Sequence, residues 1–249
     1  MNICIFLPHH IRMAIKKVAL VTGANKGLGL EIAKQLGQQG ITVVMAARDE
    51  GKAKTAAEEL KREGFDAYPV KLDVTNAEDI AKLPQFFQEH FGQLDILINN
   101  AGVTYDFDGD ITADTLRRTY ETNVIGPFAI TKALLPLLKA SPAGRIVNQS
   151  SMLGSLALMS KGQGGEFAKP GYTTSKAALN MLTVITAREL KDTKVKVNAA
   201  HPGWVQTDLG GKNAPLTVQE GAQTAVTLAT LDESGPTGAF LHKGRPLPW

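Results

Sequence analysis

The chain has 249 residues, of which 43% are hydrophobic, and a formal net charge of +3. Its length and apolar content fit one globular domain with a large core. The mild, unclustered charge argues against a nucleic-acid surface, and no apolar run reaches the ~18 residues that a membrane span needs. The single cysteine, Cys4, excludes an internal disulfide framework, so we expect a cytoplasmic protein.

Residues 1–13 differ from the rest of the chain. Residues 3–8 are apolar, but no basic segment precedes them and no small-residue cleavage site follows, which argues against a secretory signal. The run Met13-Ala14-Ile15-Lys16-Lys17 resembles a natural chain start that leads into the first strand. We interpret residues 1–13 as a disordered extension or a translational-start artefact, and residues 14–249 as a single folded domain.

Apolar strand-like runs alternate with helical patterns along this domain. The predicted strands span residues 18–21, 41–46, 67–72, 94–98, 145–148 and 194–200. The predicted helices span residues 28–39, 50–63, 77–91, 113–139, 172–190 and 219–230, and an irregular Gly-rich segment precedes Pro170. This alternation predicts the α/β class, with a single doubly wound parallel sheet and helices on both faces in a Rossmann-type three-layer sandwich.

A glycine-rich turn, Gly23-x-x-x-Gly27-x-Gly29, follows the first predicted strand. Gly23 permits a tight turn, Gly27 and Gly29 let backbone and pyrophosphate approach, and the next helix offers N–H donors to phosphates. Lys26 is followed by glycine rather than Ser or Thr, which excludes a Walker loop. We therefore predict a dinucleotide-binding catalytic domain, with cofactor contacts in this turn from Gly23, Asn25, Lys26, Gly27, Leu28 and Gly29.

The end of the second predicted strand, Ala46-Ala47-Arg48, indicates the type of dinucleotide. Proteins that bind NAD place an acidic residue about 20 residues after the turn, where it holds the ribose 2′-hydroxyl. Here that acid is missing, and the guanidinium of Arg48 can bind a 2′-phosphate in its place. Lys26 can add a second cation. The pattern favours NADPH over NADH.

Tyr172 and Lys176 lie four residues apart in a helical run, which places a phenol and an ammonium on one helix face. A neighbouring cation lowers the pKa of a phenol from its usual value of about 10. Tyr172 can then exchange a proton with a carbonyl or alcohol oxygen. The pair alone is weak support, because such a spacing often arises by chance, and its weight comes from the other motifs.

Five motifs in order resemble the short-chain dehydrogenase/reductase family and cover nearly the whole chain from Lys16 onward. They are Thr22-Gly23-x-x-x-Gly27-x-Gly29, Asn99-Asn100-Ala101-Gly102, Ser151, Tyr172-x-x-x-Lys176 and Pro202-Gly203. The glycine-turn variant, the run Pro202-Gly203-Trp204-Val205-x-Thr207-Asp208 and the terminal Trp249 resemble the NADPH-dependent carbonyl reductase branch. The resemblance implies hydride transfer from NADPH to the carbonyl of small ketones, aldehydes or quinones.

The resemblance also implies residue roles. Tyr172 would be the general acid, Lys176 would hold the nicotinamide ribose and lower the phenol pKa, Ser151 would hydrogen-bond the substrate oxygen, and Asn123 would hold a water that links Lys176 to solvent. The further implied cofactor contacts are Asp73 and Val74 at the adenine, Asn100, Ala101 and Gly102 at the adenosine side, and Val205 and Thr207 at the nicotinamide carboxamide. Donors aimed at an oxygen that becomes an alkoxide stabilise the transition state.

Ser151 and Tyr172 are 21 residues apart, several more than in many members of the family. The extra segment, residues 159–169, resembles a longer insertion in carbonyl reductases. Its three glycines between 162 and 165 favour mobility, so we interpret it as a lid over a pocket lined by Tyr105, Met152, Trp204 and the residues after Leu209. The family often tetramerises through the Tyr172 helix, and the insertion favours a monomer over a dimer or tetramer.

Two other functions remain open. The same site can oxidise a secondary alcohol with NADP⁺, and a sensor or interaction protein can bind NADPH without turnover. An enoyl reductase is disfavoured, because those relatives space Tyr and Lys seven positions apart. A hydrolase is disfavoured because there is no Gly-x-Ser-x-Gly elbow. The five histidines show no ligand spacing, so we expect no metal.

Overall fold

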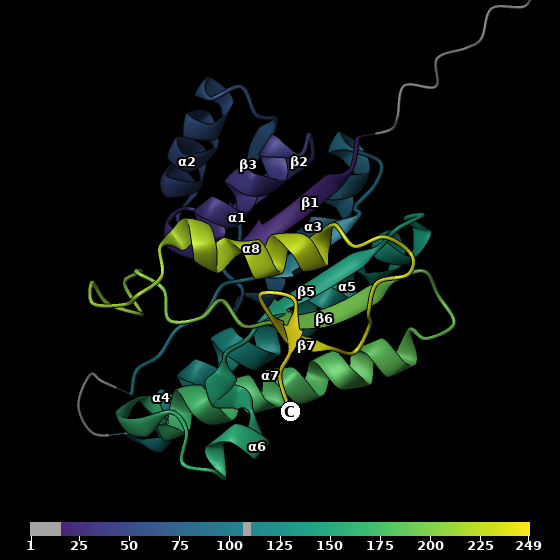
Figure 1. The fold of residues 1–249 in the computed structure, drawn as a ribbon. Helices are drawn as coiled ribbons and strands as arrows, with labels where there is room; N and C mark the ends of the chain where they lie inside the picture. Colours follow the sequence, from purple (N-terminus) through teal and green to yellow (C-terminus); the bar gives the residue numbers. More distant parts are fainter. Residues whose placement is uncertain (1–15, 107–110) are drawn as a thin grey trace, which may run out of the picture.

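The computed structural model describes residues 16–106 and 111–249. They form an eight-stranded sheet in the order β3-β2-β1-β4-β5-β6-β7-β8 (Figure 1). All neighbouring strands pair parallel except β8, which pairs antiparallel with β7. The strands are β1 (Val18–Thr22), β2 (Thr42–Ala47), β3 (Ala67–Lys71), β4 (Ile96–Asn99), β5 (Arg145–Gln149), β6 (Lys196–Ala200), β7 (Phe240–His242) and β8 (Arg245–Pro246).

Helices cover both faces of the sheet, as Figure 1 shows for α8 on one side and α7 on the other. One face packs against α1 (Gly27–Gln38), α2 (Glu50–Arg62) and α8 (Val218–Ala229). The opposite face packs against α3 (Ala77–His90), α5 (Gly126–Ala140) and α7 (Pro170–Glu189). The predicted fold class, a doubly wound Rossmann-type sandwich, is confirmed.

The element boundaries follow from local sequence chemistry. Every residue of β1, β2, β4 and β5 is buried, as expected for parallel strands with helices on both faces. The α2 and α3 helices begin after Asp49 and Asn76, whose side chains accept N–H groups of the first turn. Thr217 begins α8 in the same way, in a capping box with Glu220.

Three parts of the fold differ from the prediction. The helix predicted over residues 113–139 is divided into α4 (Ala113–Tyr120), a π-helical turn η1 (Glu121–Ile125) and α5. The segment before Pro170 contains three short helices, η2 (Met152–Gly154), α6 (Leu156–Met159) and η3 (Gly165–Phe167). The β7 and β8 strands were not predicted, because such short strands carry no readable periodicity. The predicted extension, residues 1–13, lies outside the described residues, and the single-domain boundary stays a prediction.

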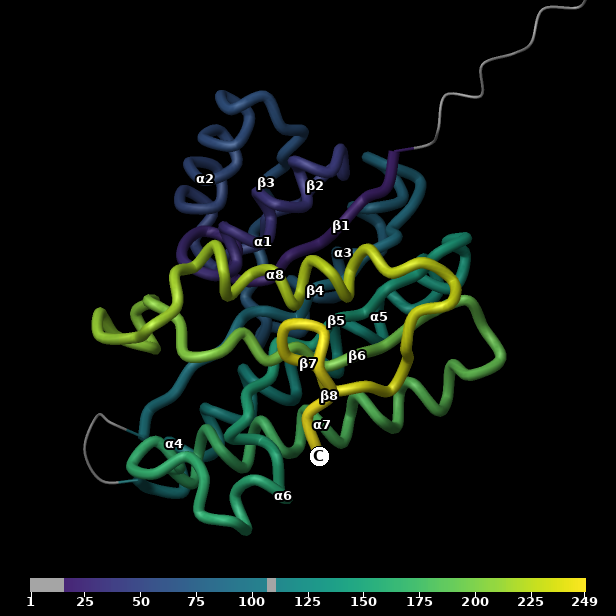
Figure 2. Tube along the Cα trace, in the orientation of Figure 1, coloured from purple at the N-terminus to yellow at the C-terminus, as the bar shows by residue number. Residues whose placement is uncertain are grey.

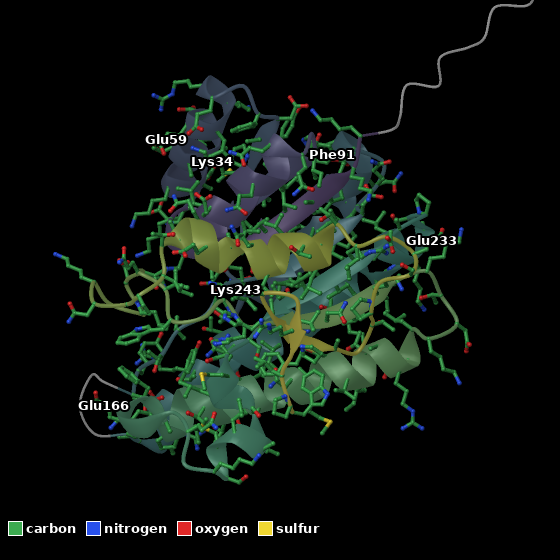
Figure 3. The ribbon with its side chains drawn as sticks, viewed as in Figure 1. Lys34, Glu59, Phe91, Glu166, Glu233 and Lys243 are labelled. Carbon is green, nitrogen blue, oxygen red and sulfur yellow. The ribbon has the colours of Figure 1, made fainter. Side chains whose placement is uncertain are left out.

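The carboxyl ends of the strands define where a ligand can bind. The strand order reverses between β1 and β4, and such a switch point opens a crevice at the carboxyl edge of the sheet. The loops after β1, β4 and β6 gather at this edge (Figure 2). Figure 3 shows Glu166 on this side of the molecule and Glu233 on the opposite side. Among the described residues, no helix is long and apolar enough to span a bilayer.

Candidate active site

The glycine turn joins β1 to α1 and is fastened to the end of β4. Gly23 and Gly27 have φ values of 64° and 55°, which residues with a side chain rarely adopt. A Cβ on Gly29 would lie 2.3 Å from the Gly23 carbonyl oxygen. The Thr22 hydroxyl accepts the Asn100 N–H at 3.0 Å, and Asn100 Nδ2 donates to the Thr22 carbonyl at 2.8 Å. Each glycine therefore meets a geometric need, and Asn100 supports the turn.

A cleft of about 310 Å³ lies beside this turn. It is lined by Asn25, Lys26, Lys52, Thr55, Ala56 and Glu59. Arg48 is exposed directly after β2, and the adjacent acid, Asp49, accepts the Lys52 N–H at 3.0 Å as the cap of α2. Lys26 forms an exposed ion pair with Asp208 of the loop after β6. Lys52 was not predicted, because no motif marks it.

The predicted adenine contacts, Asp73 and Val74, follow β3 in a fixed loop. The buried carboxylate of Asp79 accepts the Asp73 N–H and the Lys71 ammonium, each at 2.9 Å. Burial would raise the pKa of Asp79, but these two donors outweigh it and hold the pKa below its usual value. A Cβ on Gly126 would lie 2.6 Å from the Val74 carbonyl oxygen. The loop is therefore held by buried contacts.

Tyr172, Lys176 and Ser151 lie together at the carboxyl end of β5. Lys176 Nζ donates to the Gln149 carbonyl oxygen at 2.8 Å and lies 5.4 Å from the centre of the Tyr172 ring. The Ser151 side chain lies near enough to the Tyr172 hydroxyl to favour a lower pKa of the phenol. A Cβ on Gly102 would lie 3.5 Å from Lys176 Nζ, so the end of β4 borders the same group. The structure brings the predicted catalytic residues together, and their roles stay predictions.

Burial sets the protonation of this cluster. Desolvation raises the pKa of Tyr172 to about 12, although the Ser151 hydroxyl opposes the shift. Desolvation also lowers the pKa of Lys176 to about 8. The predicted lowering of the phenol pKa by Lys176 is therefore wrong for this structure, because burial dominates and the ammonium binds a backbone carbonyl. At neutral pH the phenol is protonated, which is the form that can donate a proton.

Asn123 lies in the π-helical turn η1 and is fully buried. Its Oδ1 accepts the Val103 N–H at 2.9 Å, and its Nδ2 donates to the Val103 carbonyl at 2.9 Å and to the Ser175 hydroxyl at 3.0 Å. A π turn within a helix often marks a functional site. The Asn123 amide holds the loop after β4 beside α7, while its predicted contact with a water stays a prediction.

Asp106 supports the catalytic helix and was not predicted. Its buried carboxylate accepts the N–H groups of Gly171 and Tyr172 at 3.1 Å and 2.6 Å, and it also accepts the Thr104 hydroxyl at 3.2 Å. These bonds cap the first turn of α7 from a distant loop, because the N-cap residue Lys169 supplies no side-chain cap. Asp106 therefore positions the backbone that carries the phenol.

A second set of contacts holds the β5 loop against α7. Asn180 accepts the Ser150 hydroxyl at 2.6 Å and donates to the Gly154 carbonyl at 3.1 Å. A Cβ on Gly154 would lie 2.6 Å from the carbonyl carbon of Lys176. The loop that carries Ser151 thus packs directly on the backbone that carries Lys176, and position 154 has no room for a side chain.

The sequence matches the family model for short chain dehydrogenases over residues 17–216. The chain belongs to the short-chain dehydrogenase/reductase family. It is similar to carbonyl reductase (NADPH) 1 of Mus musculus, with 36% identity and coverage of 94% of this chain and 99% of that protein. The predicted resemblance is confirmed, and the chain is an oxidoreductase.

Solved structures of reductases agree with this assignment. The chain is similar to the NADPH-bound carbonyl reductase from chicken fatty liver, with a TM-score of 0.83, 31% identity and coverage of 95% of this chain and 100% of that one. It is also similar to salutaridine reductase from Papaver somniferum, with a TM-score of 0.79, 32% identity and coverage of 92% and 100%.

The loop after β6 borders the glycine turn of this short-chain dehydrogenase. Val205 is buried, and a Cβ on Gly27 would lie 3.7 Å from the Thr207 methyl group. The Thr207 hydroxyl accepts the Gly210 N–H at 3.1 Å. Thr207 therefore lies against the glycine turn, and the predicted contacts of Val205 and Thr207 with the nicotinamide stay predictions. Ala101, Gly102 and Leu28 complete the predicted cofactor residues at the same edge of the sheet.

The inserted segment contacts the loop after β6. The rings of Phe167 and Trp204 lie 5.3 Å apart, and Trp204 Nε1 donates to the Gly210 carbonyl at 2.7 Å. The three inserted glycines all have positive φ, and a Cβ on Gly164 would lie 2.8 Å from a Leu153 methyl group. These glycines therefore shape tight turns, and their predicted mobility and lid role stay predictions. The guanidinium carbon of Arg118 lies 4.1 Å from the centre of the Tyr105 ring, and the predicted place of Tyr105 in the pocket lining stays a prediction.

The imidazole of His201 accepts hydrogen bonds from two loops of the dehydrogenase site. This role was not predicted. Its Nδ1 accepts the N–H groups of Met152 and Gly203 at 3.3 Å and 3.4 Å, so the acceptor nitrogen must be unprotonated. Burial, and secondly the nearby His242, lower the pKa of His201 to about 4. Among the described residues, no group of three His, Cys, Asp or Glu side chains is arranged to hold a metal.

The neutral state of His201 predicts a pH dependence of stability. Its folded pKa of about 4 lies below the ordinary 6.5, so the stabilisation is complete above about pH 6.5 and is lost as pH falls towards 4. The shift corresponds to about 3 kcal/mol. Denaturant unfolding at about pH 6.5 and at about pH 4 measures how much stability each protein loses on acidification. His201→Gln should lose less unfolding free energy than the wild type. The exposed His90→Gln is the matched control, and equal losses of unfolding free energy in all three proteins would contradict the assignment.

Proposed function

We propose that this chain is an NADPH-dependent carbonyl reductase of small ketones, aldehydes or quinones. The convergence of Tyr172, Ser151 and Lys176 at the sheet edge that carries the glycine turn is the observation that supports it most directly. The names of the similar proteins, carbonyl reductase (NADPH) 1 of Mus musculus and the NADPH-bound carbonyl reductase of chicken, support the cofactor and the reaction.

Tyr172, Ser151 and Lys176 would act together to protonate the carbonyl oxygen of the substrate. The cofactor, when bound, supplies the hydride. Tyr172 would give its proton to the carbonyl oxygen as negative charge develops there, and Ser151 would donate a hydrogen bond to the same oxygen. Lys176, held by the Gln149 carbonyl, would place a positive charge near the phenolate that forms. The same atoms can run the reverse oxidation of an alcohol, since a catalyst accelerates both directions.

A direct assay tests the proposal. Purified protein is mixed with NADPH and a panel of activated ketones, quinones and aldehydes, and the loss of NADPH absorbance is followed together with alcohol or quinol formation. We expect carbonyl-dependent consumption with a matching amount of product. Binding of NADPH without turnover across the panel would instead support a sensor or interaction protein.

Arg48 is expected to select NADPH. A charge-assisted contact to a 2′-phosphate is worth roughly 1.5–3 kcal/mol, so Arg48→Asp should weaken NADPH relative to NADH by about tenfold to a hundredfold. The dissociation constants of both cofactors, measured by titration, give the ratio. Lys61→Asp makes the same charge change at the far end of α2 and should leave the ratio unchanged. An unaltered ratio in Arg48→Asp would show that Lys26 or Lys52 reads this position.

We also propose a monomer in the cytoplasm. The support for a monomer is the inserted segment, residues 159–169, which directly precedes α7. The competing observation is that Phe128, Met181 and Ile185 are exposed on α5 and α7, where a dimer would form. Light scattering on purified protein measures the mass in solution, and a mass twice that of the chain would refute the monomer.

A further inference from the structure

His201 is the first residue after β6, and its imidazole joins the loops that follow two neighbouring strands. Nδ1 accepts the N–H of Met152, in the loop after β5, at 3.3 Å, and the N–H of Gly203, in the loop after β6, at 3.4 Å. Among the described residues, neither N–H has another acceptor. One lone pair shared by two donors gives long bonds, and a flipped ring would place a carbon there and lose both. A single ring nitrogen therefore connects the two loops.

The imidazole of His201 is itself held in place by β7. The His201 N–H donates to the Leu241 carbonyl at 2.8 Å, and the His201 carbonyl accepts a hydrogen bond from Nδ1 of His242 at 2.9 Å. The two imidazole rings lie 4.8 Å apart, and only 8% of His201 is exposed. Burial, and secondly His242, lower the pKa of His201 to about 4, so Nδ1 keeps its lone pair at neutral pH. The acceptor is therefore fixed both in position and in protonation.

The two connected loops carry different parts of the site. Ser151, which would donate to the substrate oxygen, directly precedes Met152. Val205 and Thr207, the predicted nicotinamide contacts, follow Gly203, and Thr207 lies against the glycine turn. The spacing between the loops would therefore set how far the substrate oxygen lies from the hydride donor. A misplacement of about 1 Å can slow a reaction about 100-fold, so this spacing matters for catalysis.

We propose that His201 is a positioning residue, whose Nδ1 holds the loop of Ser151 and the loop of Val205 and Thr207 at the spacing that carbonyl reduction requires. This inference depends on the proposed function, and it assigns a role to a side chain that no catalytic or cofactor motif includes. His201 acts through two backbone N–H groups rather than on the substrate. The place of the acceptor atom therefore matters, and an acceptor elsewhere on the side chain does not replace it.

The test compares two uncharged amides at this position. In His201→Asn, Oδ1 can occupy the place of Nδ1, whereas in His201→Gln, which is closer to histidine in size, Oε1 corresponds to Nε2. We expect His201→Asn to stay within about threefold of the wild-type kcat/KM for a carbonyl substrate, and His201→Gln to lose about tenfold to a hundredfold. Adenosine 2′,5′-bisphosphate carries only the adenine half of the cofactor, so its dissociation constant should be unchanged in both variants.

Hydrogen exchange adds a readout that needs no activity. The Met152 and Gly203 amides should exchange at the wild-type rate in His201→Asn and about tenfold faster in His201→Gln, since each amide loses its acceptor there. Equal exchange in all three proteins, or a kcat/KM that both variants retain or lose equally, overturns the proposal. His201→Leu removes the acceptor if His201→Gln folds poorly. A wild-type protein without carbonyl turnover refutes the proposed function instead, and the exchange rates then decide whether His201 couples the loops.

Discussion

Replacing Tyr172 with Phe should reduce the turnover of carbonyl substrates by about 10²–10⁴-fold while NADPH still binds. The substitution removes the hydroxyl that burial keeps protonated and leaves the ring that packs near Lys176. No other titratable group of the described cluster is placed as well, since the Lys176 ammonium is bonded to the Gln149 carbonyl. Steady-state kinetics gives the turnover, and fluorescence titration gives the NADPH affinity.

The exposed Tyr68 is the matched control for this prediction. It lies on β3, and its ring contacts Phe91 at the amino-terminal side of β4. Tyr68→Phe should retain wild-type turnover. If Tyr172→Phe also retains it, the proton comes from another donor, and Ser151→Ala then identifies whether that donor is the neighbouring hydroxyl.

Replacing Arg145 with Met should destabilise the fold by about 3–5 kcal/mol. The guanidinium is 2% exposed and donates to the carbonyls of Leu231, Asp232, Gly144 and Lys194 at 2.7–3.3 Å. Burial lowers its pKa, while the charges of Asp232 and Glu233 oppose that shift. A methionine would leave four carbonyls without this donor. Because natural proteins are stable by only about 5–15 kcal/mol, the loss would be large.

Denaturant unfolding measures this loss of unfolding free energy. The position of Arg145 adds a second expectation, which concerns NADPH affinity. It begins β5, at the end of the sheet remote from the site, on the side where Glu233 lies (Figure 3). The NADPH affinity of the folded variant should therefore be unchanged. Arg145→Lys keeps a charge but loses the planar fork, so we expect an intermediate loss. The exposed Arg188→Met is the control, and similar stabilities of the two methionine variants would contradict the role.

Much of the fold follows from periodicity. The strands from β1 to β6 and their helices were predicted because continuous apolar runs and amphipathic helices are visible over short windows. The meeting of Ser151, Tyr172 and the glycine turn was also predictable, since the carboxyl ends of parallel strands share one edge. Lys26 lies where it was expected, but its pairing with Asp208 joins residues far apart in the sequence and could not be foreseen.

What could not be predicted depends on burial and on contacts between distant segments. The pKa of Tyr172 shifts upward rather than downward, and only the packed structure reveals how much water is excluded. Asp106 and His201 act through neighbours from other loops, and no local pattern distinguishes them from ordinary residues. The C-terminal Trp249 was noted only as a resemblance, yet its carbonyl accepts the Ala157 N–H at 2.9 Å.

The π-helical turn at Glu121–Ile125 makes the site sensitive to chain length as well as to residue identity. Such a turn amounts to one surplus residue in a regular helix. Deleting that residue would let α4 and α5 merge, and each residue of an α-helix rotates the chain by about 100°. Either the Asn123 amide would leave Val103, or α4 would turn relative to the sheet. A single-codon deletion that leaves every motif residue in place would thus dismantle the arrangement.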